Sequence, residues 1–300
     1  MTMKNRITVA VALVLTVISL DLNAQNALPF TRIDRNPRTS AFAGAGMAST
    51  HNGWYSAFGN AAQLGFGQGV VDAGAGLQLW EMSNEVDKTT NIHAGAAYYK
   101  NHFGIALGGA YQMGMMQGTF TPSDRLLSIG LAYNVADVIS IGVNARYAAQ
   151  ALTQDHTLSG FSADVTLLGR VSPRFTVAAG VGNIGNRVMG STQYYSQPAF
   201  AHAGLSWMAL NSSAHSIELL LDAEYNFDGS FAVAIGSEYT YNHLFYVRTG
   251  YRLASEKALI PSHLGVGLGV KYEFLRVEAG YLAASPVLGN TLNLGVGVSF

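Results

Sequence analysis

The last ten residues of the chain, 291–300, alternate strictly between large apolar residues and small or polar ones. Successive side chains of a β-strand point to opposite faces, so this pattern predicts a strand with one apolar and one polar face. The apolar face carries Leu292, Leu294, Val296, Val298 and Phe300, and the other face carries Asn293, Gly295, Gly297 and Ser299. Such alternation over a full segment is typical of a strand in an outer-membrane β-barrel.

The same alternation recurs from about residue 69 onward, in segments separated by turn residues. Each segment is close to the ~9–11 residues that a tilted strand needs to cross a bilayer. The 14 predicted strands are 69–80, 90–99, 102–113, 124–134, 138–149, 158–170, 174–184, 199–209, 215–227, 229–241, 243–253, 262–273, 275–283 and 291–300. An even number suits a closed single-chain barrel. The predicted fold class is therefore all-β: a closed antiparallel transmembrane β-barrel of about 14 strands.

The connections between these segments alternate in length. If the first strand runs outward, short turns fall on the periplasmic side near 100–101, 134–137, 172–174, 210–214, 242 and 273–274. Longer connections fall on the outer side near 83–89, 114–123, 150–157, 185–198, 254–261 and 284–290, and only the tight 227–229 departs from the pattern. Short periplasmic turns and long outer loops are the expected asymmetry. Both ends of the mature chain are thus predicted to be periplasmic.

Composition supports a membrane barrel over a soluble domain. Charged residues make up 12% of the chain, against roughly 25% in an average soluble protein, while hydrophobic residues remain at 49%. We expect outer-membrane lipid as the surrounding partner. The net charge of −1 gives no reason to expect nucleic acid as a partner. Cysteine is absent, which excludes disulfides and thiolate metal sites.

The N-terminus has the pattern of a secretory signal. Lys4 and Arg6 precede the apolar stretch 7–20, and Ala24 is a small residue at a plausible cleavage point. The apolar run is shorter than the ~20 residues that a spanning helix needs, which favours cleavage over a retained anchor. Residues 1–24 are therefore predicted to be a signal peptide. A secreted chain that has no later apolar stretch of helix-spanning length and is poor in charge points to the outer membrane of a Gram-negative cell.

Residues 25–68 do not follow the strand pattern. The stretch 39–66 is rich in Ala, Gly and Ser, which let backbones pack closely. We predict that it forms a compact hatch folded into or under the barrel lumen; the alternative is a flexible periplasmic leader. A leader would leave several large apolar side chains in water, which favours the hatch. These side chains are Phe42, Met47, Trp54, Tyr55, Phe58, Leu64 and Phe66.

Two motifs in this segment carry a family resemblance. The matching residues are Arg38, Ala41, Ala43, Gly44, Ala45, Gly46 and Ala48, followed by Asn60, Ala61 and Ala62. They resemble the R-x-x-A-x-G-G-A-like opening and N-P-A-like tripeptide of the FadL superfamily and of its Bacteroidetes relatives, the PorV/PorQ family associated with type IX secretion. Ala61 departs from the family, because proline is usual there. Leu-Pro-Phe at 28–30, before Arg32-Ile33-Asp34, also looks like the start of a mature PorV/PorQ-type chain.

The resemblance implies a FadL-like barrel in a Bacteroidetes-like outer membrane. It also implies an N-terminal hatch at 25–68, ahead of the barrel at 69–300. The hatch residues singled out are Ala43, Gly44, Gly46, Trp54 and Asn60. The resemblance does not identify a cargo.

Much of the chain's charge falls on the predicted inward face of the strands. The assigned lumen cluster comprises Arg146, Asp164, Glu218, Asp222, Glu224, Glu238, Arg248, Arg252, Lys271 and Glu273. A turn centred at Asp228 places Glu218 opposite Glu238, and a turn centred at Asn242 places Glu238 opposite Tyr246 and diagonal to Arg248. The cluster is either a ligand-positioning constriction or an internal salt-bridge network, and buried charges are expected to be paired.

The sequence does not favour catalysis. The eight histidines are scattered, and no H-E-x-x-H or G-x-S-x-G motif occurs. We expect no cofactor and no metal. The remaining hypotheses are a FadL-like conduit for a hydrophobic small molecule, a PorV/PorQ-like component that handles secreted proteins, and a purely structural barrel. Met113, Met115, Met116 and Phe120 in one outer connection suit either of the first two.

Overall fold

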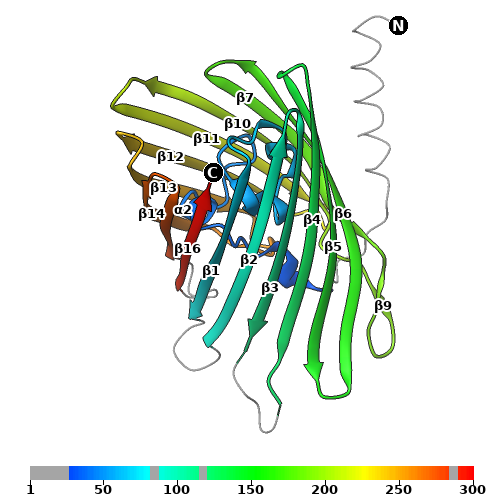
Figure 1. The fold of residues 1–300 in the computed structure, drawn as a ribbon. Coiled ribbons are helices and arrows are strands. Elements are labelled where there is room, and N and C mark those ends of the chain that lie inside the picture. The colour runs from blue at the N-terminus through cyan, green and yellow to red at the C-terminus, as the bar shows by residue number, and fades with distance from the viewer. Residues whose placement is uncertain (1–26, 82–87, 115–119, 284–289) are drawn as a thin grey trace, which may run out of the picture.

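A closed barrel of fourteen antiparallel strands dominates the computed structural model, which describes residues 27–81, 88–114, 120–283 and 290–300. Each strand pairs with its neighbour along the chain, and β1 closes the ring against β16 (Figure 1). The predicted fold class and strand number are confirmed. The predicted signal peptide, 1–24, lies outside the described residues. None of the described helices is long and apolar enough to cross a membrane.

The barrel strands agree closely with the predicted segments. They are β1 (Val71–Glu81), β2 (Lys88–Lys100), β3 (Phe103–Met113), β4 (Ser123–Val135), β5 (Ile139–Thr153), β6 (His156–Ser172), β7 (Phe175–Gly185), β10 (Phe200–Asn211), β11 (His215–Asn226), β12 (Phe231–Tyr241), β13 (Phe245–Ala254), β14 (His263–Tyr272), β15 (Leu275–Ala283) and β16 (Asn290–Ser299).

Two connections differ from their predicted form. The connection at 150–157 is not a long loop, because β5 and β6 continue until Thr153 pairs with His156. The connection after β7 contains a small hairpin of β8 (Val188–Met189) and β9 (Tyr194–Tyr195). All connections at one mouth of the barrel are two or three residues long, whereas several at the other mouth are longer. We call these the short-turn mouth and the long-connection mouth.

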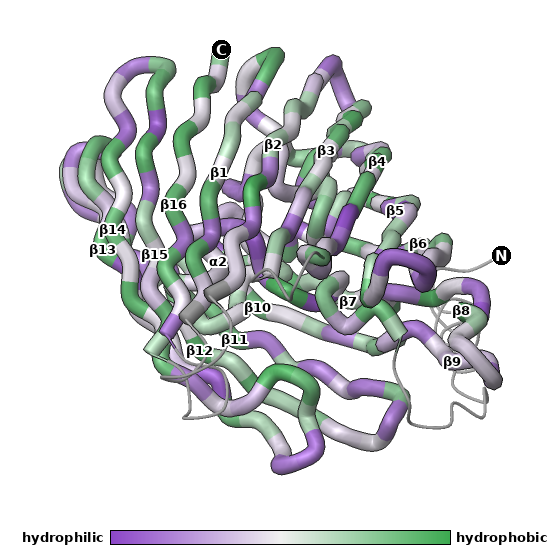
Figure 2. Tube along the Cα trace, turned by 90° about the horizontal axis from the view of Figure 1, so that it is seen from below, coloured by the Kyte–Doolittle hydropathy of each residue, from purple (hydrophilic) through white to green (hydrophobic). Residues whose placement is uncertain are grey.

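Apolar side chains cover the outside of the barrel. In β12, for example, Val233 and Ile235 are exposed, while the alternating residues Ala232 and Ala234 are buried. Figure 2, coloured by hydropathy, shows hydrophobic and hydrophilic residues interspersed along the strands. The alternation read from the sequence therefore sets which side chain faces out, as strand geometry requires.

Residues 27–68 lie inside the ring of strands (Figures 1 and 2). The segment contains four short helices: η2 (Pro29–Arg32), α2 (Pro37–Ala41), η3 (Gly53–Ala57) and η4 (Ala61–Phe66). α2 contacts β13 to β16, η3 contacts β1 to β4, and η4 contacts β2 to β6. The segment thus reaches most of the wall, and we call it the hatch.

The hatch begins at the long-connection mouth. The N–H of Ala27 donates to the carbonyl of Ser196 at 2.8 Å, and Leu28 packs with Val188. Phe300, by contrast, ends at the short-turn mouth, where its carbonyl accepts the N–H of Val70. The prediction placed both ends of the mature chain at one mouth, but the described chain begins at the opposite mouth from Phe300. Local patterning could not show this, because the entry point depends on contacts with distant loops.

Glycines on the inner wall allow the hatch to sit directly against the strands. A Cβ added at Gly250 would lie 2.3 Å from the backbone of Phe42, and one at Gly280 would lie 2.3 Å from the carbonyl of Pro37. Across the barrel, a Cβ at Gly142 would lie 2.0 Å from the nitrogen of Ala62. Larger residues at these positions would push the hatch away from the wall. The high glycine content therefore serves hatch packing.

Candidate functional site

Arg38 of α2 joins the hatch to the barrel wall. Its Nε donates to Glu238 Oε2 at 3.0 Å, and its Nη2 donates to Glu218 Oε2 at 2.6 Å. Glu218 and Glu238 are directly opposed on β11 and β12, as their predicted register requires. Two buried carboxylates at this spacing would repel each other without a cation. The hatch supplies that cation, and all three side chains are buried.

The α2 helix positions Arg38 through a local cap. The Asn36 side chain accepts the N–H of Arg38 at 3.0 Å, and Pro37 occupies the first turn. An asparagine cap followed by proline is a favourable helix start. Burial alone would lower the pKa of Arg38, but Glu238 and Glu218 outweigh it and raise that pKa above its ordinary value. The guanidinium therefore stays charged.

The ion pairs continue around the wall from Glu238. Arg248 Nε lies 2.5 Å from Glu238, and its Nη1 lies 2.8 Å from Glu278 Oε1. Arg276 then pairs with Glu278 at 3.0 Å and with Asp72 at 3.4 Å. The chain of charges spans from β11 to β1 and borders the short-turn mouth.

Three of the predicted lumen residues differ in how they compare with their predicted positions. Arg248 pairs directly with Glu238, whereas Tyr246 pairs with Thr240, because the β12–β13 turn is centred one residue later than predicted. Lys271 lines the polar cavity at the short-turn mouth. Glu273 does not face the lumen: it is exposed in the β14–β15 turn, with a φ of 51°. The prediction of an inward Glu273 extended the strand period into a turn, and it is wrong.

A second network lies toward the long-connection mouth. Arg32 of the hatch and Arg252 of β13 both contact Glu224, at 2.7 Å and 2.8 Å. Elsewhere in this region Arg146 is ion-paired with Asp164. The ten predicted cluster residues thus do not form one site: nine belong to two separate layers of the lumen, and Glu273 belongs to neither.

The predicted hatch residues occupy defined roles. Gly46 has a φ of 131° and donates its N–H to Asp222 Oδ2 at 2.8 Å. Ala43 and Gly44 also have positive φ, at 55° and 91°. Trp54 is fully buried, and its backbone N–H donates to Asp72 Oδ1 at 2.9 Å.

Asn60 takes the role of a helix cap. Its side chain accepts the N–H of Ala62 at 2.8 Å, and its Nδ2 donates to the carbonyl of Met47 at 2.9 Å. The first bond caps the start of η4, and the second ties that helix to the segment between α2 and η3. Asn60 therefore fixes the shape of the hatch even though Ala61 replaces the usual proline.

Side-chain amides form a polar seal across the hatch. Asn36 Nδ2 donates to Asn52 Oδ1 at 3.2 Å, and Asn52 Nδ2 donates to Gln63 Oε1 at 3.0 Å. Gln63 Nε2 in turn donates to the carbonyls of Gly46 and Met47. Gln63 lines cavities on both sides of this layer. We call Asn36, Asn52 and Gln63 the amide seal.

Three of the cavities lined by described residues lie along the lumen. The lower chamber, of about 640 Å³, lies at the short-turn mouth and is lined by Arg38, Lys271 and other polar groups. The upper chamber, of about 340 Å³, lies at the long-connection mouth. Between the upper chamber and the amide seal lies a polar chamber of about 190 Å³, which shares Arg32, Ile33 and Arg252 with the upper chamber.

The upper chamber has an apolar body and a polar edge. Its apolar lining residues include Phe30, Ile33, Trp80, Leu259, Ile260 and Leu282. At its edge, Gln112 Nε2 donates to Asp124 Oδ2 at 3.0 Å. Largely apolar cavities with a few placed polar groups are typical of small-molecule sites. Among the described residues, no group of three or more His, Cys, Asp or Glu side chains is arranged to hold a metal ion.

One of several register shifts in the wall lies beside the polar chamber. Between β6 and β7 the register shifts, so that Ala163 pairs with Ile184 but Val165 pairs with Val181. The extra residue is accommodated near Asn183, which has a φ of 54° and donates its N–H to Asp164 at 2.8 Å. Such a bulge locally interrupts the ladder. β3, in contrast, pairs without a shift on both edges.

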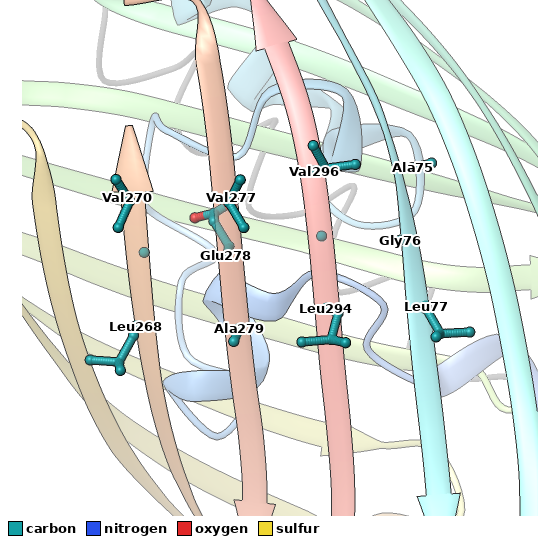
Figure 3. Close-up of a pocket in the computed structure, with 12 residues that line it drawn as sticks. Ala75, Gly76, Leu77, Leu268, Val270, Val277, Glu278, Ala279, Leu294 and Val296 are labelled. Carbon is teal, nitrogen blue, oxygen red and sulfur yellow. The ribbon is translucent and has the colours of Figure 1, made fainter. Parts of the chain in front are cut away.

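A further groove, of about 500 Å³, lies on the outside of the barrel and not in the lumen. Figure 3 shows Leu268, Val270, Leu294 and Val296 beside the small residue Ala279 on β14 to β16. Its surroundings are those of the apolar outer face, so the candidate site is confined to the three lumen chambers.

Sequence reasoning missed several residues of these chambers. It assigned Arg32, Arg35 and Arg38 no partner, because their partners are distant in the chain. It also missed Asp72, which accepts the N–H of Trp54 from the hatch. The available signal for the three arginines was their recurrence every third residue, just ahead of the small-residue stretch 39–66.

Comparison with known proteins identifies the fold. The toluene transporter TbuX of Ralstonia pickettii aligns with a TM-score of 0.66 and 13% identity, covering 88% of this chain and 98% of that one. The chain has a FadL-type barrel fold. A FadL homologue of Pseudomonas aeruginosa also aligns, with a TM-score of 0.60 and 10% identity over 88% of this chain and 98% of that one.

The toluene transporter TodX of Pseudomonas putida has the same FadL-type fold, at a TM-score of 0.66 and 12% identity, covering 88% of this chain and 98% of that one. No family model matches the sequence, and no curated protein matches it. At these identities the likeness concerns the fold.

Proposed function

We propose that this protein is a non-enzymatic outer-membrane barrel that takes up a small hydrophobic molecule through its long-connection mouth. The observation that carries the proposal is the upper chamber: an apolar cavity of about 340 Å³ that lies directly above a sealed hatch. An apolar molecule gains free energy by leaving water for such a cavity. The hatch, which contacts most of the wall, supports this proposal over a general porin with an open aqueous pore.

The proposed orientation places the short-turn mouth and Phe300 in the periplasm. The apolar outer face of the strands then contacts outer-membrane lipid. The long-connection mouth faces the outside, where hydrophobic molecules arrive. We further propose that cargo leaves sideways near Asn183, because the β6–β7 ladder is interrupted there beside the polar chamber.

The solved structures of the same fold support a transport role. TbuX and TodX are described as toluene transporters. Their names concern those proteins, and the cargo of this chain is inferred from its own chambers. The secretion hypothesis receives less support from the lumen, because the hatch occupies the space that a polypeptide would need.

Transport can be tested in proteoliposomes loaded with a sink for an apolar aromatic compound. The wild-type protein should accelerate uptake of toluene over protein-free vesicles. Ile260→Trp should reduce this uptake, because the larger ring fills the upper chamber that Ile260 lines. Leu253→Trp is the matched control, since Leu253 is 58% exposed on the outside. Equal uptake by the two variants, or by wild-type and empty vesicles, would contradict the proposal.

The secretion hypothesis makes the opposite demand on a strain that lacks the protein. Loss of a conduit reduces uptake of an apolar compound while secreted proteins still reach the cell surface. Loss of a secretion component leaves those proteins in the periplasm while uptake remains normal. Stranded secreted proteins with intact uptake would overturn the conduit.

A further inference from the structure

The polar chamber beneath the upper chamber carries an unusual set of unpartnered groups. Among the described residues, seven side chains that line it each have a buried polar atom without a hydrogen-bond partner. Buried polar atoms are nearly always paired with protein or water. With about 190 Å³ available, the chamber has room for several water molecules or for part of a ligand.

The charges around the chamber balance. Four arginines and four carboxylates line it. Arg32, Arg252 and Glu224 neutralise one another in part, and Arg146 pairs with Asp164. An anionic group entering the chamber would therefore meet as many negative as positive side chains, and an electrically neutral group fits better.

The hatch also contributes Arg35 and Asp34 to the chamber. Arg35 donates from Nη1 and Nη2 to the carbonyls of Ile33 and Phe30, at 2.9 Å and 3.0 Å, and its Nε is unpartnered among the described residues. Asp34 accepts through Oδ1 from Asn36 and Thr39, and its Oδ2 is unpartnered in the same sense. Burial lowers the pKa of Arg35 to about 10 and raises that of Asp34.

The wall adds Asp222 and His202. Asp222 Oδ2 accepts two backbone N–H groups from the hatch at 2.8 Å, while Oδ1 has no partner among the described residues. The His202 ring packs edge-on against the Phe200 ring, with 4.9 Å between the ring centroids. Its Nε2 likewise lacks a hydrogen-bond partner in the described part of the chain. The chamber thus offers both unpartnered donors and unpartnered acceptors.

We infer that the cargo is an amphipathic molecule with an uncharged hydroxyl head, such as a phenol or an alcohol, whose head occupies the polar chamber while its apolar body occupies the upper chamber. This inference rests on the proposed function. A hydroxyl both donates and accepts hydrogen bonds, whereas a carboxylate only accepts and would leave the aspartate oxygens unpaired. A pure hydrocarbon satisfies none of the polar atoms. The two chambers adjoin, because both are lined by Ile33 and Ile260.

The test uses three ligands that share one methylated ring: toluene, 4-methylphenol and 4-methylbenzoate. Binding to the full chain in lipid nanodiscs is measured by calorimetry, with empty nanodiscs as the blank. We expect 4-methylphenol to bind about tenfold tighter than toluene, which corresponds to about one net hydrogen bond. The charged 4-methylbenzoate should bind no tighter than toluene.

A variant assigns the effect to the polar chamber. His202→Phe keeps a ring that can contact Phe200 but removes the Nε2 atom, which has no hydrogen-bond partner among the described residues, so the fold does not depend on it. It should reduce the preference for 4-methylphenol over toluene at least threefold and leave toluene binding unchanged. His93→Phe is the control for the loss of a buried imidazole. His93 is also buried, has an unpartnered Nε2 among the described residues and does not line this chamber, although its Nδ1 lies 3.1 Å from Asn91 Oδ1.

The outcomes separate the inference from the function on which it rests. Equal binding of toluene and 4-methylphenol, with both lost in Ile260→Trp, would overturn the hydroxyl head and keep the conduit. Tightest binding of 4-methylbenzoate would overturn it in favour of an anion site. An equal loss of preference in His93→Phe and His202→Phe would also overturn it. Absence of binding by all three ligands would overturn the proposed function as well.

Discussion

Arg38 Nε lies 3.0 Å from Glu238 Oε2, and this contact joins residues that are 200 positions apart in the chain. The same guanidinium also reaches Glu218, so one hatch residue neutralises two opposed wall carboxylates. Removing one partner of a buried charge group leaves the others unpaired, which is strongly destabilising. The hatch is therefore held by electrostatics as well as by packing.

Arg38→Met should loosen the hatch and lower the free energy of unfolding by about 3–5 kcal/mol, because Glu218 loses its cationic partner and Glu238 keeps only Arg248. The measurement is the transition to the unfolded form in denaturant, together with limited proteolysis of the hatch. Arg187→Met, at an exposed position, is the control and should have little effect. Adding Glu218→Gln and Glu238→Gln to Arg38→Met should restore part of the loss; no restoration would contradict the pairing.

Gly250→Ala should displace the hatch, since the added Cβ would lie 2.3 Å from the backbone of Phe42. Overpacking of this kind costs about 1–3 kcal/mol. Gly59→Ala is the matched control, because a Cβ at Gly59 meets nothing within 4 Å. Thermal unfolding of both variants checks the expectation. If the two lose the same stability, the close seating of the hatch on the wall is wrong.

Gln63→Ala should raise single-channel conductance in planar bilayers. The substitution removes the amide that contacts Asn52, and Gln63 lines the chambers on both sides of the seal. Water and ions then gain a continuous path through the hatch. The control is Gln193→Ala in the outer hairpin connection, which is exposed and distant from the lumen. A closed channel in Gln63→Ala would mean that the amide seal does not set the permeability.

Leu219→Arg should destabilise the barrel by about 2–4 kcal/mol if the residue lies at mid-bilayer, because a charge on the outer face would enter lipid. Leu219 is exposed on β11, between the inward residues Glu218 and Leu220. Unfolding in lipid vesicles gives the measurement. Asn211→Arg, at the short-turn end of β10, is the control and should cost much less. A neutral Leu219→Arg would show that β11 does not face lipid there.

The strands, their number and their facing were predictable from the amino-acid sequence. Each depends on a period of two within a single segment, which requires no knowledge of distant residues. The opposition of Glu218 and Glu238 was predictable for the same reason, because the tight turn at Asp228 sets the register of that hairpin. The next turn, between β12 and β13, is centred one residue later than predicted. Arg248, and not Tyr246, is therefore the direct partner of Glu238.

The hatch contacts required the tertiary structure. Composition could indicate that residues 25–68 were packed. It could not show that they enter from the long-connection mouth, that Arg38 faces Glu238, or that Asp34 and Arg35 line a chamber with Asp222. These relationships join residues far apart in the chain, and they depend on how the closed ring of strands presents its inner face to one short segment. Local sequence sets the direction in which a strand side chain points, whereas only the closed barrel sets which side chains meet across the lumen.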